Sequence, residues 1–174
     1  MKAKGEQVIL VGTQDEVLGL MDKQKAHIEG LLHRAISIFV FNNRHELMLQ
    51  QRAAHKYHSP LLWANTCCSH PRQGETTIEA AHRCLVEEMG FDCPLEEQFY
   101  FTYKAEMDNI LIENELDHVL LGRYEGIPKV NPKEVTTWRW IALSELIKEI
   151  RIHPEYYAIW LRIIIERYAE KLKS

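Results

Sequence analysis

The 174-residue sequence has no apolar run that approaches the 18 residues needed to cross a bilayer. The residues after Met1 are too short and too weakly apolar a run for a signal peptide. There is no internal repeat, no low-complexity segment and no linker rich in Pro, Gly or Ser. We therefore expect a single domain over residues 1–174, with residues 1–30 forming an N-terminal strand or lid extension.

A strong charge of one sign is missing as well. The chain has 21 Lys and Arg against 25 Asp and Glu, which gives a formal net charge of −4. A broad surface for nucleic acid or for an anionic membrane needs an excess of basic residues, so we expect neither as a partner. This balance still permits a small basic pocket for one anionic ligand.

Cysteine is scarce, with four residues, and neither their number nor their spacing predicts a disulfide scaffold. Cys67 and Cys68 are adjacent and poorly placed to pair with each other. We expect free thiols and a reducing, cytoplasmic location, with Cys67, Cys84 and Cys93 as small buried apolar side chains. Nine His stand out by contrast, although a single His is usually an ordinary surface or core imidazole.

The hydropathy pattern predicts strands that alternate with helices. The expected strands are 8–11, 16–23, 35–41, 46–52, 98–105, 117–124 and 135–142, and 35–41 with 46–52 is expected to form a buried hairpin. Helices are expected over 76–89, with Thr76 or Thr77 as the cap and Gly90 after its end, over 143–150, and from Pro154 to about residue 172. Together these elements predict a mixed α/β domain with helices packed on a sheet.

A motif lies on the first of these helices. The segment from Ser69 to Phe91 reads SHPRQGETTIEAAHRCLVEEMGF. It resembles the Nudix box, G-x5-E-x7-R-E-U-x-E-E-x-G-U, in which U is bulky and apolar. The matching residues are Glu75, Arg83, Leu85, Glu87, Glu88, Gly90 and Phe91. The resemblance implies a Nudix-like α/β/α sandwich with a mixed sheet.

Two positions depart from the box. Ser69 replaces its first Gly, and Cys84 replaces the Glu that follows Arg83. In Nudix hydrolases that Glu belongs to the cluster that holds Mg²⁺ on a diphosphate, so its loss argues against hydrolysis. Glu87 and Glu88 remain as hard oxygen ligands for Mg²⁺. Taken by itself, such a pair is equally typical of a solvated helix face.

Further motifs flank the box. They read GLLHRAISIFVFN at 30–42, LLWANTCCSHP at 61–71 and IENELDH at 112–118. In combination they resemble the type I isopentenyl diphosphate isomerases, which carry an altered Nudix fold, over about residues 23 to 160. The resemblance implies interconversion of isopentenyl and dimethylallyl diphosphate in isoprenoid precursor biosynthesis, by protonation and deprotonation through a tertiary carbocation.

The resemblance also implies a metal site of three imidazoles and two carboxylates, which are His27, His33, His70, Glu113 and Glu115. Nitrogen and oxygen ligands without a thiolate suit six-coordinate Mn²⁺, Mg²⁺ or Zn²⁺. Glu113 and Glu115 are two residues apart, so on a strand both face one side and Asn114 faces the other. A second ion, Mg²⁺, is expected with the diphosphate through Glu88. The six other imidazoles are expected to be ordinary.

The catalytic cysteine of the family matches Cys68, and its second proton-handling group matches Glu115, assisted by Tyr103. An acid and a base on opposite sides of the substrate suit a shift of an alkene bond. Which of the two acts first stays open. Trp160 matches the aromatic residue that faces the carbocation. A role for Trp160 in the core of the last helix is equally open, and the two roles are compatible.

The residues that match the family's diphosphate contacts are Lys23, Arg52, Lys56 and Arg83. Each alone is equally a solvated surface cation, and Arg83 is equally an ion-pair partner inside the box. The expected ligand is a small allylic or homoallylic diphosphate, and the expected assembly is a monomer or weak dimer. Two other functions stay open: a Nudix pyrophosphohydrolase acting on a nucleoside diphosphate derivative, and a metal-dependent binding domain without catalysis.

Overall fold

The computed structural model describes residues 6–107 and 110–173, and the first five residues of the expected N-terminal extension lie outside them. The strands are β1 (Gln7–Val11), β2 (Val17–Asp22), β3 (His33–Phe41), β4 (Glu46–Arg52), β5 (Trp63–Ala64), β6 (Cys67–Ser69), β7 (Leu95–Glu106), β8 (Ile112–Arg123) and β9 (Val135–Ala142). The α-helices are α1 (Lys23–Glu29), α2 (Thr77–Cys84), α3 (Leu143–Ile152) and α4 (Ile159–Tyr168). None of the helices in these two ranges has both the length and the apolar character to span a membrane.

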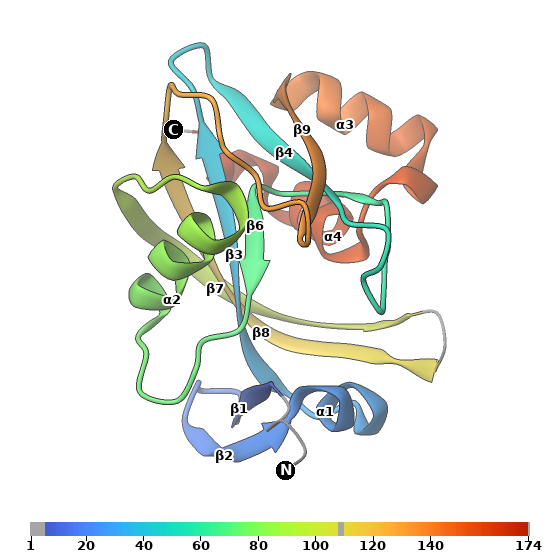
Figure 1. Ribbon diagram of the computed structural model, residues 1–174. Coiled ribbons are helices and arrows are strands. Elements are labelled where there is room, and N and C mark those ends of the chain that lie inside the picture. The colour runs from blue at the N-terminus through green and yellow to red at the C-terminus, as the bar shows by residue number, and fades with distance from the viewer. Residues whose placement is uncertain (1–5, 108–109, 174) are drawn as a thin grey trace.

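Strand β3 is the centre of a mixed sheet (Figure 1). It pairs in parallel with β8, with His33 opposite Glu115, and antiparallel with β6, with Ser37 opposite Cys68. β8 continues antiparallel to β7, and β4 pairs antiparallel with β9 and β5. The first residue of β3 also joins the β1–β2 hairpin. This order places Cys68 and Glu115 on the two strands that border β3.

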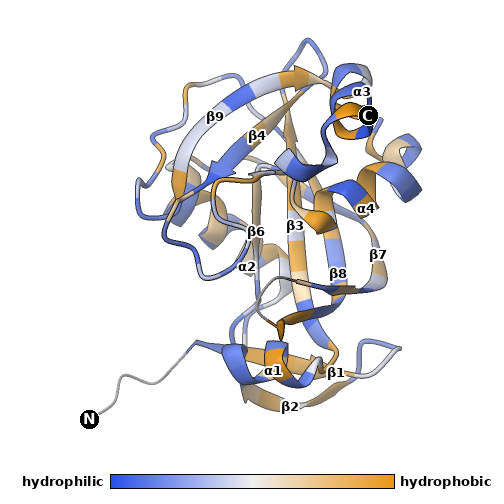
Figure 2. Cartoon of the chain, turned by 90° about the vertical axis from the view of Figure 1, so that its right-hand side faces the viewer, coloured by the Kyte–Doolittle hydropathy of each residue, from blue (hydrophilic) through white to orange (hydrophobic). Residues whose placement is uncertain are grey.

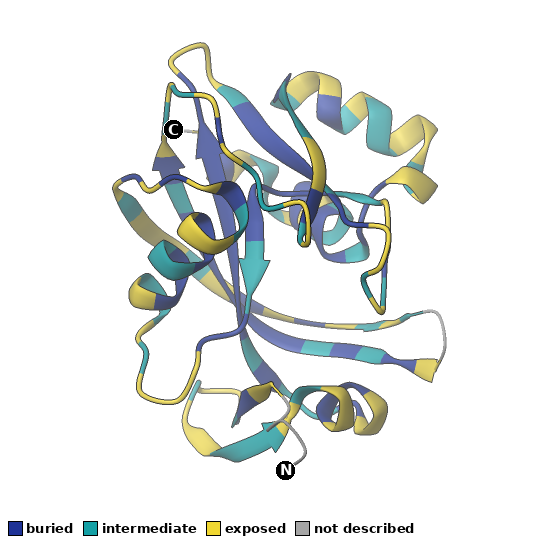
Figure 3. Cartoon of the chain, viewed as in Figure 1, coloured by how far each residue is buried: buried dark blue, intermediate teal, exposed yellow. Residues whose placement is uncertain are grey.

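Helices cover both faces of the sheet. Ile36, Ile38 and Val40 of β3 belong to the core under α2, whereas Phe39 and Phe41 belong to the core under α3 and α4. Alternation along a strand sends successive side chains to opposite faces, and β3 is buried along most of its length (Figure 3). The predicted α/β/α sandwich is confirmed. Figure 2 shows α1, β1 and β2 at one end of β3 and α3 and α4 near the other.

Helix α2 has the ends that its sequence predicts. The Thr76 hydroxyl accepts from the Glu79 N–H at 3.2 Å, and the Glu79 carboxylate accepts from the Thr76 N–H at 2.8 Å, which makes a capping box. After Cys84 the helix widens into a π-helical turn, Leu85–Met89. Gly90 ends it at a φ of 70°, where a Cβ would lie 2.2 Å from the Lys129 carbonyl oxygen.

The prediction of one final helix from Pro154 is wrong. A 3₁₀ turn, Pro154–Tyr156, is followed by Tyr157 in extended conformation, and α4 begins only at Ile159. Tyr157 forms a bridge with Trp63, and the Ala158 N–H donates to the Trp63 carbonyl at 2.9 Å. The chain therefore leaves the helix to pair with β5, a long-range contact that helical periodicity does not encode.

Three short elements, α1, β5 and β6, were not predicted. α1 starts at Lys23, where a strand was expected to end, because the Asp22 side chain caps it by accepting from the Lys25 N–H at 3.0 Å. The expected hairpin of 35–41 with 46–52 forms only next to its turn, where β3 and β4 pair antiparallel at Phe41 with Leu47. Beyond that point β6 pairs with β3 and β5 pairs with β4 instead.

A disulfide joins Cys67 to Cys84, contrary to the expectation of two free apolar thiols. It links β6 to the last residue of α2 across 17 positions, and both residues are fully buried in the core under α2. The period of the strand sends Cys67 to that core and Cys68 to the opposite face. Cys68 and Cys93 are free, and Cys93 is buried as predicted.

We expect replacement of Cys84 by Ala to lower the free energy of unfolding by about 3 kcal/mol, because a disulfide across a loop of this length restricts the unfolded chain by that amount. Urea denaturation of the wild-type and C84A proteins under oxidising conditions measures the difference. Dithiothreitol should destabilise the wild type and leave C84A unchanged. A wild-type denaturation curve that does not respond to dithiothreitol would contradict the bridge.

Candidate active site

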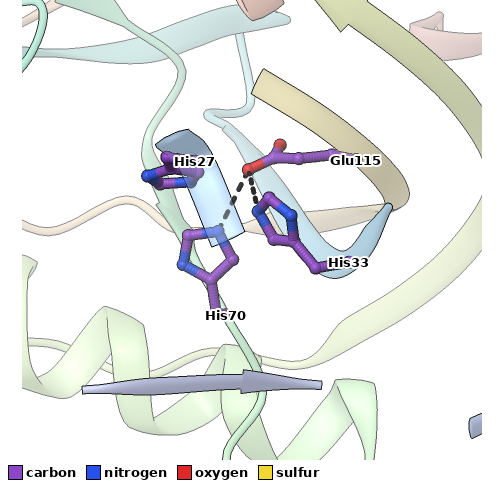
Figure 4. A group of neighbouring side chains, drawn as sticks. All are labelled: His27, His33, His70 and Glu115. Atoms are coloured by element: carbon purple, nitrogen blue, oxygen red, sulfur yellow. Dashed lines mark hydrogen bonds and ion pairs between the residues drawn. The ribbon is translucent and has the colours of Figure 1, made fainter. Parts of the chain in front are cut away.

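Three imidazoles and one carboxylate meet at the start of β3 (Figure 4). His27 comes from α1, His33 is the first residue of β3, His70 follows β6, and Glu115 lies on β8. One ligand atom of each lies within 4.8 Å of the others. Glu115 Oε1 is 3.0 Å from His70 Nε2 and 3.5 Å from His33 Nε2. Ligands at about 2.1 Å from an octahedral ion lie about 3 Å from each other, so this spacing suits a shared ion.

Buried nitrogen and oxygen atoms without hydrogen-bond partners also indicate a metal site. His33 Nδ1 donates to the Leu31 carbonyl at 2.8 Å, which leaves the lone pair on Nε2. His27 Nδ1 shares a hydrogen bond with the Tyr57 hydroxyl. Nε2 of both rings and Oε2 of Glu113 are buried without a hydrogen-bond partner. Such atoms are rare in proteins, and neutral imidazoles beside carboxylates are the donor set of a divalent metal.

Two of the three imidazoles, His27 and His70, have a pKa well below physiological pH. Burial, together with the neighbouring His33 and His70, lowers the pKa of His27 to about 3. Burial also lowers the pKa of His70 to about 4, although its hydrogen bond to Glu115 acts in the opposite direction. Both rings can therefore offer a lone pair without first losing a proton.

Glu113, the fifth expected ligand, stands beside this group. Its Oε2 is 3.7 Å from His27 Nε2, and its Oε1 is 3.4 Å from His58 Nε2. Burial and the nearby charge of Glu115 hold the pKa of Glu113 well above its usual range. As expected, Asn114 faces the other side, where its amide donates to the Gly30 carbonyl at 2.9 Å.

His58 was expected to be an ordinary imidazole, and the structure places it beside the expected metal ligands. Only 9% of its side chain is exposed, and it faces Glu113. The sequence offered only the high count of His as a signal, because residue 58 lies in the loop between β4 and β5, far along the chain from Glu113.

A pocket of about 560 Å³ opens beside the cluster. The predicted site residues that line it are Lys23, Arg52, Lys56, Cys68, His70, Arg83, Glu88, Glu113, Glu115 and Trp160. His27, His33 and Tyr103 are buried and do not line it. The Tyr103 hydroxyl donates to Glu115 Oε2 at 2.7 Å, so Tyr103 reaches the site through Glu115. The lining residues that the sequence did not predict include Glu6, Tyr57, His58 and Glu134.

Two of the groups that line the pocket, Cys68 and Glu115, have pKa values shifted in opposite directions. Burial raises the pKa of the Cys68 thiol to about 12, so the thiol keeps its proton at neutral pH. Burial alone would raise the pKa of Glu115 as well, but the neighbouring His33 and His70 imidazoles outweigh it and hold the pKa well below its usual range. A pair of titratable groups driven apart in this way is typical of an acid and a base in one site.

The position of Trp160 is compatible with both of the roles that were left open. It belongs to the core under α4, and it also forms part of the pocket wall. Its indole N–H donates to Asn65 Oδ1 at 3.1 Å, which fixes the ring. The Arg52 guanidinium lies 5.1 Å from the ring centroid, within the range of a cation–π contact.

The basic residues of the pocket already have partners. Lys23 Nζ is 3.1 Å from a Glu6 carboxylate oxygen, and Lys56 is ion-paired with Glu134. Arg52 donates to two backbone carbonyls of the following loop, each at 3.2 Å. Two of these cations are thus neutralised by carboxylates that line the same pocket.

Arg83 is an ion-pair partner inside the box, the alternative that the sequence left open. It donates to Glu75 at 2.7 and 2.8 Å and to Glu87 at 3.2 Å, and it also donates to the His70 carbonyl at 3.3 Å. Glu87 and Glu88 both line the pocket but differ in exposure, since Glu87 is exposed and Glu88 is half-buried. Glu88 accepts from Gln50 at 3.1 Å, and burial raises its pKa.

Comparison with known proteins agrees with this arrangement. Residues 31–162 match the NUDIX domain family. The fold resembles the DR0079 protein of Deinococcus radiodurans, with a TM-score of 0.78 and 21% identity over 93% of this chain and 98% of that one. It also resembles a MutT protein of Methanosarcina mazei, with a TM-score of 0.67 and 15% identity over 82% of this chain and 96% of that one. Fold and motif together define a NUDIX domain protein.

The curated relatives narrow this class. Isopentenyl-diphosphate Delta-isomerase 2 of Aromatoleum aromaticum is 51% identical over 93% of this chain and 86% of its own length. Isopentenyl-diphosphate Delta-isomerase of Pectobacterium atrosepticum is 47% identical over 97% of this chain and 96% of its own. The chain belongs to the type I isopentenyl-diphosphate Delta-isomerase family, as its motifs predict. It is therefore an isomerase of a family that uses a divalent metal.

We expect Mn²⁺ to stabilise the folded protein, because the buried ligand atoms come together only when the chain folds. At 100 times its dissociation constant, the ion should add about 2.7 kcal/mol. Thermal unfolding with and without Mn²⁺ measures the shift. His33→Ala should abolish it, while His55→Ala, an exposed imidazole, should keep it. An equal shift in H33A would contradict the site.

Cys68 should react slowly with iodoacetamide, since the thiolate is the reacting form. With the pKa at about 12 instead of the ordinary 9.0, the thiolate fraction at pH 9 falls about 500-fold. A Cys93→Ala background leaves Cys68 as the free thiol, and the alkylation rate should keep rising up to about pH 12. A rate that levels off near pH 9, as in the denatured protein, would be the opposite result.

Proposed function

We propose that this pocket interconverts isopentenyl diphosphate and dimethylallyl diphosphate, the reaction for which its relatives are named. One observation carries the proposal: the Cys68 thiol and the Glu115 carboxylate line the same pocket, where the pKa of the thiol is raised and that of the carboxylate is lowered. Lys23, Arg52 and Lys56 line that pocket and supply cations for a small diphosphate, once Lys23 and Lys56 release their carboxylate partners Glu6 and Glu134.

The chemistry needs one proton to be added and another to be removed. An alkene is a very weak base, so a positioned acid must protonate it, and the product is a tertiary carbocation. A base on the other side then removes a proton to give the isomer. Cys68 and Glu115 lie on the strands that border β3 and are the two groups we assign. Because the reaction runs in both directions, each group donates in one direction and accepts in the other.

Trp160 and Tyr103 support this pair. The face of the Trp160 ring can stabilise a desolvated cation by about 2 kcal/mol, and the ring is held by its hydrogen bond to Asn65. Tyr103 holds Glu115 through its hydroxyl. Exclusion of water matters as well, because water would trap the cation.

The ligand atoms described above fit a divalent ion at His27, His33, His70 and Glu115, joined by Glu113, and we propose Mn²⁺, Mg²⁺ or Zn²⁺ there. A cation bound there withdraws electron density from the Glu115 carboxyl and strengthens it as a proton donor. Glu88 would hold a second ion, Mg²⁺, together with the diphosphate.

For the diphosphate we propose that Lys23 and Lys56 exchange Glu6 and Glu134 for phosphate oxygens. Lys23 begins α1, so β1, β2 and α1 would act as a lid over a pocket in the single domain. Arg83, held by the box, would act by supporting His70. We further propose that the protein is cytoplasmic. Its proposed assembly is a monomer or weak dimer, which sedimentation would test.

Cys68→Ala and Glu115→Gln should each lower kcat for isomerisation at least 10³-fold while the protein remains folded. The assay is conversion of isopentenyl diphosphate in D₂O with Mg²⁺ and Mn²⁺, read as deuterium in the product. Cys93→Ala is the matched control for a lost thiol and should keep wild-type turnover. Near wild-type turnover in C68A or E115Q would refute the mechanism.

The same assay separates the alternatives. Deuterium incorporation without phosphate release is expected. Phosphate release from a panel of nucleoside diphosphate derivatives would instead indicate a pyrophosphohydrolase. Metal and diphosphate binding without label incorporation would indicate a binding domain.

A further inference from the structure

Glu113 is the least constrained of the expected metal ligands. It lies outside the group formed by His27, His33, His70 and Glu115, and its Oε2 is buried without a hydrogen-bond partner. Its other oxygen is 3.4 Å from His58 Nε2. Glu115, by contrast, contacts two imidazoles and a tyrosine hydroxyl. The Glu113 carboxylate thus faces the Glu115 carboxyl and the imidazole of His58.

The ring of His58 is itself held firmly. Its carbonyl accepts from Arg52 at 3.2 Å, which anchors the loop after β4. Its Nδ1 is 3.4 Å from the Ser59 hydroxyl, so Nε2 is left to face Glu113. The ring lies edge-on to Tyr57, with centroids 4.5 Å apart, and edge-on to Trp160, with centroids 5.9 Å apart.

We propose that His58 is a positioning residue that holds Glu113 against the metal site and ties that site to the Trp160 wall of the pocket. The inference rests on the proposed function. A ligating carboxylate binds a metal well only when a neighbouring group fixes its orientation, and loss of such a group weakens metal binding 10- to 100-fold. Without His58, the Glu113 side chain gains rotational freedom and the ion loses its fifth ligand.

The contacts also explain why His58 acts through Glu113. Its ring does not belong to the set of ligand atoms that converge within 4.8 Å, whereas His27, His33 and His70 do. It reaches that set through Glu113, whose Oε2 is 3.7 Å from His27 Nε2. A positioning role therefore predicts that removal of His58 matters only while Glu113 is a carboxylate.

The test is a Mn²⁺ titration of substrate-free protein, followed by the electron paramagnetic resonance signal of free Mn²⁺. His58→Ala should weaken Mn²⁺ binding 10- to 100-fold. His58→Gln, whose amide can still donate to Glu113, should stay within about threefold of wild type. His55→Ala, an exposed imidazole of the same loop, should bind as wild type. If H58A does not fold, His58→Asn, with a shorter amide, replaces it.

A double-mutant cycle with Glu113→Gln decides between positioning and direct ligation. H58A/E113Q should bind Mn²⁺ no more weakly than E113Q alone, and saturating Mn²⁺ should return kcat of H58A to within a few-fold of wild type. Wild-type affinity in H58A, or additive losses in the double variant, would overturn the proposal. Failure of the proposed function is distinct: wild type would then bind Mn²⁺ with the same dependence on His58 but incorporate no deuterium.

Discussion

The pairing of β3 with β8 on one side and β6 on the other is the constraint on which the rest of the structure depends. These strands come from three separate parts of the sequence, and each carries polar groups on the face that lines the pocket. The register sets Glu115 opposite His33 and Cys68 opposite Ser37. A slip of one residue would turn every one of these side chains to the opposite face, into the apolar core under α2.

That pairing brings together polar and titratable side chains whose burial costs free energy. Among the described residues, buried imidazoles, buried carboxylates and the half-buried thiol of Cys68 lie around one pocket. Asp117, two residues beyond Glu115, adds another carboxyl that accepts from Ser37, and burial holds its pKa well above the usual range. Polar groups without partners in a protein interior cost free energy. They persist because the apolar cores on both faces of β3 provide the stability, and a bound cation would satisfy the unpaired atoms.

Local signals predicted local structure well. The Thr76 cap, the Gly90 end and strand β9 follow directly from residues near each other in the sequence. The residues matched to the family come together around one pocket or behind its wall, because motif spacing fixes the identity of a side chain before its surroundings are known. The failures share one cause. The start of the last helix, the Cys67–Cys84 bridge and the place of His58 all depend on contacts between segments distant in the chain.

The few cysteines illustrate the division between what the sequence determines and what the tertiary structure decides. The sequence by itself determined that few thiols exist, which of them follows the family motif, and that no broad basic surface is present. Only the tertiary structure decided that Cys67 turns into one core and pairs, while its neighbour Cys68 turns into the pocket and keeps its proton. The reason is physical: a side chain's identity is local, but its burial, its pKa and its partners are set by whichever strands lie beside it.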